Sequence, residues 1–344
     1  MIPFHQRLHP AVRHGGFQQD DYWVWCGSVV KGEDDRYHMF AARWPKSYPF
    51  YHGYLAASEV VRASSDTPEG PYAFEEVVLP ERGPDFWDGR MTHNPFIIKR
   101  GEEYLLFYIG SSYPGPRPDL SEIDRLRRAK PVGNGDLPFW FHDIRIGMAR
   151  SGSVFGPWQR PDTPTLDNRP DHWDNHIVTN PAACLAPDGR ILLYYRSTGC
   201  RLGLAVAESP DHPFVRVGDG PVVDPGSGLR IEDPFVWWEK DHYEMVCKDL
   251  TGKITGEFHA AVHLHSPNGT DWSLADPVMA WSRTMRWDDG TETMQASIER
   301  PFILFEKNEP AWLFAATADG PGPREGRPGH YYAANTWNMV RPLR

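Results

Sequence analysis

The sequence contains little cysteine, no long apolar run and a deficit of positive charge. Its 344 residues include only four cysteines, none in a Cys-x-x-Cys pair. A disulfide-rich scaffold and a cysteine-rich zinc site are therefore excluded, and buried free thiols are predicted. No segment approaches the roughly 20 apolar residues that cross a bilayer. The formal net charge of −10 argues against binding to nucleic acid or to an acidic membrane, because both require a positive field.

The first seven residues, Met1 to Arg7, lack the apolar segment of a secretion signal. We expect either a cytoplasmic protein or one from which a leader has been removed. Proline is abundant: 33 prolines and 31 glycines disfavour long helices, because proline interrupts helical hydrogen bonding. The 15 His, 14 Trp and 14 Tyr residues favour a ligand with flat apolar faces and many hydroxyl groups.

A repeated pattern runs through the chain: a polar residue, a proline, an apolar run, a polar turn and a second apolar-aromatic run. In a degenerate first copy, Ser28 stands where the proline is expected. The other four copies are anchored on Pro95, Pro181, Pro234 and Pro301. The anchors lie about 68 residues apart on average, which is one fifth of the chain. Each copy predicts a hairpin of two strands.

A second repeat lies between the anchors and predicts a third strand, a turn and an edge strand with an aromatic residue. It covers residues 60–72, 146–158, 202–214 and, more loosely, 261–272. Four strands in each of five units predict an all-β, five-bladed β-propeller, with an ordinary β-sandwich as the alternative. The blades should start near 25, 92, 178, 231 and 298, and residues 1–344 should form one domain, because the ring must close. An insertion, residues 113–142, should contain a short helix within 117–129.

The two residues before each anchor should converge on one mouth of the central channel. A structural repeat would keep these pairs alike, but they differ in every blade and most carry ionisable or amide groups, which indicates a functional site. Carboxylates that meet there raise one another's pKa, as general acid-base catalysis requires. The expected pairs are Cys26-Gly27, His93-Asn94, Thr179-Asn180, Glu232-Asp233 and Glu299-Arg300.

Asp233-Pro234 at one blade start and Glu299-Arg300-Pro301 at the next resemble motifs of the five-bladed propeller glycosidases. These include glycoside hydrolase family 43, the related family 117, and families 32 and 68. The resemblance covers nearly the whole chain as a repeat pattern. It implies that Asp233 tunes the pKa of the acid and orients the substrate, and that Glu299 is the general acid. The family also has a base aspartate before the first anchor, where this chain has Gly27-Ser28.

The missing base leaves three explanations. An inverting enzyme needs a base carboxylate roughly 6.5–9.5 Å from the acid, and Asp20, Asp21, Asp88 or Asp174 are candidates. A histidine, His93 or His176, is the second option, because imidazole titrates near neutral pH. The third is attack by inorganic phosphate, as in the similar family 130 phosphorylases, with an anion site formed by Arg90, His93 and Arg300.

Substrate contacts are expected from tryptophans that stack on sugar rings and from polar groups near the mouth. Each candidate also has a structural interpretation, such as core packing, a turn cap or an ion pair between blades. The substrate-binding candidates are Trp25, Trp87, Asp88, Asn94, Trp173, His176, Asn180, Glu232 and Arg300. His263-x-His265 lacks a third ligand at metal-binding spacing, so no metal-ligand set is assigned.

Together with these residues, the resemblance implies an exo-acting, inverting glycoside hydrolase that releases a terminal sugar from a plant or algal oligosaccharide. The catalytic candidates are Glu299, Asp233, His93, Asp174 and Asp21. The alternatives are a glycoside phosphorylase and a non-catalytic glycan-binding propeller. This chemistry requires no cofactor, and the resemblance leaves room for a structural calcium or other divalent ion in the central channel. A homodimer is a further expectation, because anionic enzymes of this size often dimerise.

Overall fold

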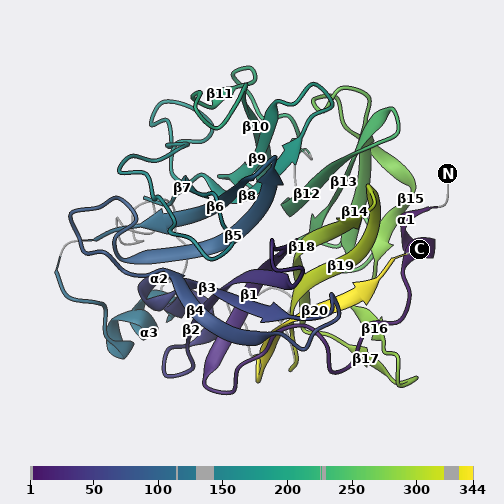
Figure 1. Cartoon of the computed structure of the whole chain (residues 1–344), viewed down its shortest axis with the longest axis horizontal. Helices are drawn as coiled ribbons and strands as arrows, with labels where there is room; N and C mark the ends of the chain where they lie inside the picture. Colours follow the sequence, from purple (N-terminus) through teal and green to yellow (C-terminus); the bar gives the residue numbers. More distant parts are fainter. Residues whose placement is uncertain are drawn as a thin grey trace.

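Five sheets surround one axis in the computed structural model, which describes residues 3–113, 115–128, 143–224, 226, 230–320 and 333–343 (Figure 1). The innermost strand of each sheet pairs with the next strand along the chain, and the order continues outward. This arrangement confirms the five-bladed β-propeller. The inner strands begin at Tyr22, Met91, Thr179, Ile231 and Ser297, close to the expected blade starts.

The blades are antiparallel sheets of successive strands. Blade 1 contains β1 (Tyr22–Lys31), β2 (Tyr37–Pro45), β3 (Glu59–Ser65) and β4 (Ala73–Leu79). Blade 2 contains β5 (Met91–Arg100), β6 (Glu103–Ser111) and β7 (Arg145–Ser151). Blade 3 contains β8 (Thr179–Leu185), β9 (Ile191–Ser197), β10 (Arg201–Ala207) and β11 (Val215–Arg216). Blade 4 contains β12 (Ile231–Glu239), β13 (His242–Asp249), β14 (Ala261–Ser266) and β15 (Ser273–Trp281).

Blade 5 closes the ring with strands from both ends of the chain. It contains β18 (Ser297–Glu306), β19 (Glu309–Ala318) and β20 (Thr336–Pro342). The N-terminal segment runs antiparallel along β20, with bridges from Phe17 to Asn338 and from Leu8 to Leu343. The short helix α1 (Phe4–Arg7) precedes this segment, and the two-stranded ribbon of β16 (Thr284–Arg286) and β17 (Glu292–Met294) lies between blades 4 and 5 in the sequence.

The axis of the propeller is filled by side chains from the inner strands. Phe96, Phe235 and Phe302 are buried, and their ring centroids lie 5.2–5.7 Å apart. Such aromatic contacts combine a large buried apolar area with favourable edge-to-face geometry.

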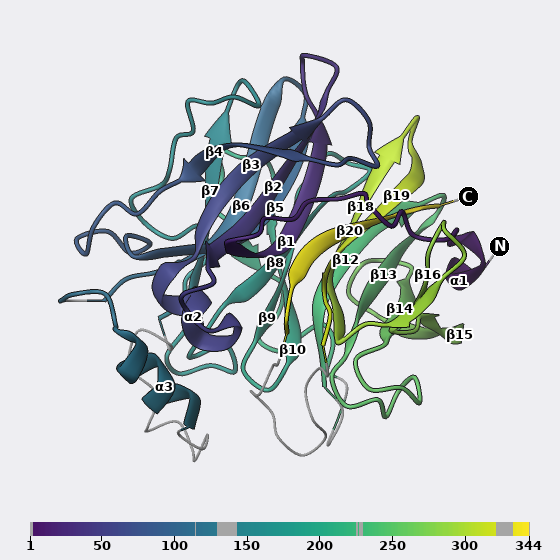
Figure 2. The same ribbon diagram turned by 90° about the horizontal axis from the view of Figure 1, so that it is seen from below.

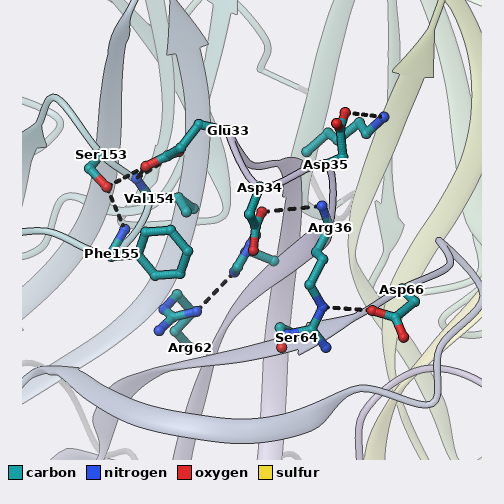
Figure 3. Close-up of polar contacts among 12 residues, drawn as sticks. Glu33, Asp34, Asp35, Arg36, Arg62, Ser64, Asp66, Ser153, Val154 and Phe155 are labelled. Carbon is teal, nitrogen blue, oxygen red and sulfur yellow. Dashed lines mark hydrogen bonds and ion pairs between the residues drawn. The ribbon is translucent and has the colours of Figure 1, made fainter.

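Blades 1 and 2 make polar contacts at the C-terminal end of β1. Glu33, in the turn after β1, accepts hydrogen bonds from the Ser153 hydroxyl and from the Val154 backbone N–H at 3.2 Å (Figure 3). It also accepts a hydrogen bond from the Tyr104 hydroxyl at 2.9 Å. In the same turn, Asp34 accepts a hydrogen bond from the Arg36 backbone N–H at 3.1 Å. The Glu33 contacts join adjacent blades on the side away from Trp25 and Cys26, which lie near the start of β1.

Two helices lie on one side of the propeller, near the ends of the blades (Figure 2). α2 (Phe50–Ala57) connects β2 to β3 and packs against β5, and α3 (Leu120–Arg128) packs against α2. α3 falls within the expected helix, whereas α2 was not expected from the sequence. Residues 129–142 of the expected insertion lie outside the described residues. In the part of the chain that the structure describes, no helix has the length and apolar character needed to cross a membrane.

Candidate active site

Every inner strand has an irregularity in register at the same place. The register shifts lie between Trp25 and Ser28, His93 and Phe96, Thr179 and Ala182, Glu232 and Phe235, and Glu299 and Phe302. Within each irregularity one residue has a positive φ: 58° at Cys26, 50° at Asn94, 53° at Asn180, 59° at Asp233 and 53° at Arg300. Non-glycine residues rarely adopt this conformation, so its repetition marks equivalent positions.

This equivalence corrects the expected alignment of blade 1. Cys26 matches the residues that directly precede the prolines, so Gly27, not Ser28, occupies the proline position. The converging pair of blade 1 is therefore Trp25-Cys26 and not Cys26-Gly27. The shift arose because neither Gly27 nor Ser28 resembles proline in the sequence. The base aspartate of the resembling families would consequently align with Cys26.

The five residues with positive φ form a polar ring around the axis, one from each blade. The Cys26 thiol donates to Asn94 Oδ1 at 2.8 Å, and Asn94 Nδ2 donates to Asn180 Oδ1 at 2.8 Å. Asn180 Nδ2 then donates to Asp233 Oδ1 at 2.5 Å, and Arg300 Nη1 lies 3.5 Å from the same oxygen. Arg300 also interacts with the Cys26 thiol, which closes the ring. The structure thus brings the pairs of all five blades together.

Next to this ring, blades 4 and 5 form a cluster of three carboxylates around one ammonium group, and Asp233 belongs to both the ring and the cluster. Lys248 Nζ lies 2.5 Å from Glu232 Oε1, 2.9 Å from Glu299 Oε1 and 3.6 Å from Asp233 Oδ2. Oxygens of the three carboxylates lie within 4.8 Å of one another. Only 3% of the Lys248 and Asp233 side chains is exposed, compared with 16% for Glu232 and 11% for Glu299. We call Glu232, Asp233 and Glu299 the carboxylate trio.

The members of the carboxylate trio have different pKa values. Burial raises the pKa of Asp233 to about 6, despite the opposing charges of Lys248 and Arg300. Burial also disfavours the ionised form of Glu232, but Lys248 and Arg196 outweigh it and lower its pKa to about 2. The pKa of Glu299 is lowered as well, because Lys248 and His259 outweigh its burial. In the unliganded site Glu232 and Glu299 are therefore anionic near neutral pH.

Several residues of this cluster were missed by the sequence analysis. Lys248 lies opposite Glu232 in the pairing of β12 with β13, and Arg196 lies opposite Thr179 in the pairing of β8 with β9. Arg196 Nε is 3.4 Å from Glu232 Oε2. The Ser297 hydroxyl donates to Glu299 Oε1. Counting residues across each predicted hairpin would have placed both cations beside the inner-strand positions.

His93 and Trp25 lie beneath α2, in the part of the site formed by blades 1 and 2. The Tyr54 ring stacks on His93 with a centroid separation of 4.7 Å, and Phe50 contacts Trp25 at 4.9 Å. His93 Nδ1 is 2.8 Å from the Ser58 hydroxyl. Burial and the nearby Arg300 charge lower the pKa of His93 to about 3, which keeps the imidazole neutral. With 4% and 5% exposure, His93 and Trp25 are covered, so neither an exposed base nor an open stacking platform is observed here.

Asp88 and Asp174 occupy matching structural sites in the loops before β5 and β8. Both are fully buried, and each is held by two arginines and one tyrosine hydroxyl. Asp88 binds Arg82, Arg160 and Tyr108, and Asp174 binds Arg169, Arg216 and Tyr195. The neighbouring Trp87 and Trp173 stack on the same tyrosines with centroid separations of 5.8 Å. These partners lie outside the carboxylate trio and tie each loop to its blade.

The other candidates are separated from the carboxylate trio or only partly exposed. Asp20 and Asp21 lie exposed in the turn before β1, and His176 is half-buried in the loop before β8. Arg90 Nη1 binds Glu81 at 2.5 Å, and its Nη2 donates to the Gly115 carbonyl at 2.8 Å. The expected phosphate site is not assembled, because Arg90 is paired elsewhere and His93 is neutral.

Neither a protein-family model nor a curated protein sequence matches the chain. Solved structures do match. BT0996, in its complex with RGII, is 13% identical with a TM-score of 0.68, covering 98% of this chain and 93% of that one. Zg3597, a family 117 glycoside hydrolase from the marine bacterium Zobellia galactanivorans, is 13% identical with a TM-score of 0.62, covering 97% and 89%.

A third similar structure is native Bacillus subtilis arabinanase Arb43A, which is 13% identical with a TM-score of 0.60 and covers 94% of each chain. A thermostable family 43 glycoside hydrolase is also among the similar structures. At such identities the similarity establishes the fold. The chain thus has the five-bladed β-propeller fold of family 43 and family 117 glycoside hydrolases, as the sequence resemblance predicted.

Proposed function

We propose that this chain is a glycoside hydrolase whose catalytic centre is the carboxylate trio. The main support is the convergence of Glu232, Asp233 and Glu299 around Lys248 at the axis of the propeller. Carboxyl groups in close pairs are the groups that most glycoside hydrolases use as acid, base or nucleophile. The fold shared with family 43 and 117 glycoside hydrolases supports the same reaction.

Glu299 is the proposed general acid and Asp233 the residue that modulates it. Asp233 is too buried to touch a sugar, and its oxygens accept hydrogen bonds from Asn180 Nδ2 at 2.5 Å and the Arg300 backbone N–H at 3.4 Å. It therefore acts through its charge. Glu299 is partly exposed but anionic in the unliganded protein. We infer that Glu299 takes up a proton as substrate binds, because a bound sugar removes water from the carboxylate and so disfavours its ionised form.

Exo action is proposed from the position of α2. Phe50 and Tyr54 cover Trp25 and His93, so the side of the mouth formed by blades 1 and 2 is closed. Glu232, Glu299 and Arg196 keep exposed fractions of 16%, 11% and 23%. A site that is open on one side favours a chain end over a long polymer. A plant or algal oligosaccharide remains the proposed substrate, supported by the arabinanase Arb43A and the marine Zg3597.

The stereochemical outcome depends on which groups react. Oxygens of the carboxylate trio lie within 4.8 Å of one another, whereas the carboxyl groups of inverting enzymes are roughly 6.5–9.5 Å apart. The trio alone is closer to the retaining spacing of about 5–5.5 Å. The proposed inverting reaction therefore needs a base outside the trio. Proton NMR of the first product distinguishes the two, since inversion changes the anomeric configuration.

The test is turnover on a panel of oligosaccharides with wild type, Glu299→Gln and Asp233→Asn. We expect both variants to lose about 10²- to 10⁴-fold in kcat while their Tm changes by a few degrees. Asp35→Asn, at an exposed turn, is the matched control and should keep full activity. Full activity in both trio variants would refute the site. Phosphate-dependent release of a sugar phosphate would identify a phosphorylase, and binding without turnover a glycan-binding protein.

A further inference from the structure

We propose that Lys248 is a positioning residue that takes the place of a divalent cation in the carboxylate trio. Its ammonium group holds the three carboxylates together, and its removal creates a calcium-binding site. The role in positioning the reacting carboxylates rests on the proposed function. The cation-replacement part rests on geometry alone and is tested without substrate.

The contacts of Lys248 match those expected of a central cation. A lysine ammonium carries three N–H donors, and Lys248 Nζ has three carboxylate neighbours at 2.5, 2.9 and 3.6 Å. The group is 3% exposed, so water does little to screen these interactions. The side chain arrives from β13, opposite Glu232, and the backbone pairing fixes its position. Lys248 is therefore part of the hairpin and not a mobile surface lysine.

The spacing of the carboxylate trio also fits a calcium ion. Calcium binds oxygen at about 2.3–2.6 Å, so two ligands on opposite sides of one ion are roughly 5 Å apart. The trio oxygens lie within 4.8 Å of one another. Magnesium binds at about 2.0–2.1 Å in strict octahedral geometry, which suits this spacing less well. Without Lys248, the buried trio loses its central compensating charge, and a hard cation with oxygen ligands would restore it.

Lys248 differs from the two arginines of the site. Arg196 approaches Glu232 alone, and Arg300 approaches Asp233 alone. Lys248 is the cation that contacts all three carboxylates among the described residues. It therefore sets the distances between the members of the carboxylate trio, whereas each arginine compensates one charge. Its loss should separate the carboxylates unless another cation enters.

The experiment compares wild type with Lys248→Ala after removal of metals by a chelator. Tm and isothermal titration calorimetry are measured with added calcium chloride. We expect Lys248→Ala to bind calcium and gain about 5 °C in Tm at a calcium concentration of roughly 100 times its Kd. Wild type should gain less than about 1 °C. Lys31→Ala, which removes an exposed lysine paired with Asp35, controls for the loss of a positive charge and should also remain unresponsive.

A second variant shows whether calcium uses the trio. Lys248→Ala combined with Glu232→Gln removes one ligand, and its calcium affinity should fall at least tenfold. A folded Lys248→Ala that ignores calcium overturns the proposal. A wild type whose Tm rises by about 5 °C with calcium also overturns it. This second measurement does not require Lys248→Ala to fold. Calcium binding by Lys248→Ala supports the proposal even if no glycan is cleaved, so its failure is distinguishable from failure of the proposed function.

On a substrate cleaved by wild type, calcium should restore part of the kcat that Lys248→Ala loses. This restoration is specific to positioning, because a variant that was only misfolded would not respond through kcat. Magnesium at the same concentration serves as the comparison and should restore less. A Lys248→Ala variant that binds calcium without any recovery of kcat would overturn the positioning part of the proposal.

Discussion

At equivalent backbone positions, blades 1 to 3 have neutral side chains, whereas blades 4 and 5 have charged ones. The first three blades contribute the neutral groups of Cys26, Asn94 and Asn180 to the polar ring, whereas the last two contribute Asp233 and Arg300. In the neutral part, amides and a thiol satisfy one another, and α2 covers the residues above. In the charged part, cations compensate the carboxylates, of which Glu232 and Glu299 remain partly exposed. The fold repeats the geometry, and the side chains decide which part is reactive.

The second strands of the blades divide differently, because their cations come from blades 3 and 4. In each inner strand, the residue directly before the member of the polar ring pairs with a residue of the second strand. In chain order these second-strand residues are Ala42, Ile109, Arg196, Lys248 and Ala316. Two neighbouring blades thus provide cations where the others provide apolar groups. Because Arg196 and Lys248 both approach Glu232, the cations are concentrated on one side of the axis. The comparison predicts that removing a charge costs more than removing a neutral hydrogen bond.

The largest effect is expected from Arg300→Met. This change removes the guanidinium 3.5 Å from Asp233 Oδ1 and leaves a buried carboxylate with less compensation. Removing one partner of a buried ion pair costs about 3–5 kcal/mol, which urea denaturation will measure. Arg300→Lys should recover part of this loss because it keeps the charge. A loss below about 1 kcal/mol for Arg300→Met would erase the distinction between the two parts of the ring.

Glu232→Gln should destabilise the protein in a pH-dependent way. The folded-state pKa of Glu232 is lowered from 4.5 to about 2, so the ionised group contributes stability above pH 4.5 that is lost as the pH falls through 2. At 1.36 kcal/mol per pKa unit, this contribution is about 3 kcal/mol at pH 7. The difference in unfolding free energy from wild type should shrink between pH 4.5 and pH 2. A difference that stays constant with pH would contradict the pairing with Lys248.

Asn94→Ala tests the neutral part and should cost about 1–3 kcal/mol, since it leaves buried partners on Cys26 and Asn180 without their amide. Asn94 also has a φ of 50°, which alanine tolerates less well. Asn94→Gly separates the two causes, because glycine removes the side chain without this backbone cost. Thermal and urea unfolding of both variants give the comparison. If Asn94→Ala costs more than Arg300→Met, the proposed ranking is wrong.

The smallest effect is expected from Cys26→Ser, at most about 1 kcal/mol, because a serine hydroxyl can donate to Asn94 Oδ1 as the thiol does. Burial raises the pKa of the Cys26 thiol well above its usual range. In the native wild type this residue should therefore react slowly with iodoacetamide at pH 8, and unfolding in urea should expose it. Mass spectrometry of the labelled peptide measures both rates. Rapid labelling in the native state would show that the ring opens.

The fold was predictable because its signal is repeated along the chain. Four prolines at regular positions identify the inner strands, and the glycine and aspartate turns between them identify the hairpins, such as Asp188-Gly189, where Gly189 has a φ of 86°. Blade 1 was misaligned by one residue because Gly27 replaces the proline. The bulge that identifies Cys26 as the equivalent residue is a backbone property and is visible only in the structure.

The candidate site was predictable in part. The convergence of Asp233 and Glu299 followed from the repeat, since equivalent positions in a propeller meet at the axis. Lys248 was missed because its contact crosses a hairpin, and Trp25 was judged without knowledge of α2. Local sequence also cannot show that Asp88 and Asp174 are held by arginines, two of which lie more than 40 residues away. Such contacts depend on how separate blades and loops pack.

The pairing of the N-terminal segment with β20 determines how the molecule responds to mechanical load. The bridges at Phe17 and Leu8 join strands from the two ends of the chain within one blade. We expect a force that pulls the ends apart to act first on these bonds. Once they separate, the seam of blade 5 opens and its neighbours lose an edge partner. We therefore expect the resistance of the propeller to stretching to depend mainly on the pairing of the N-terminal segment with β20 in blade 5.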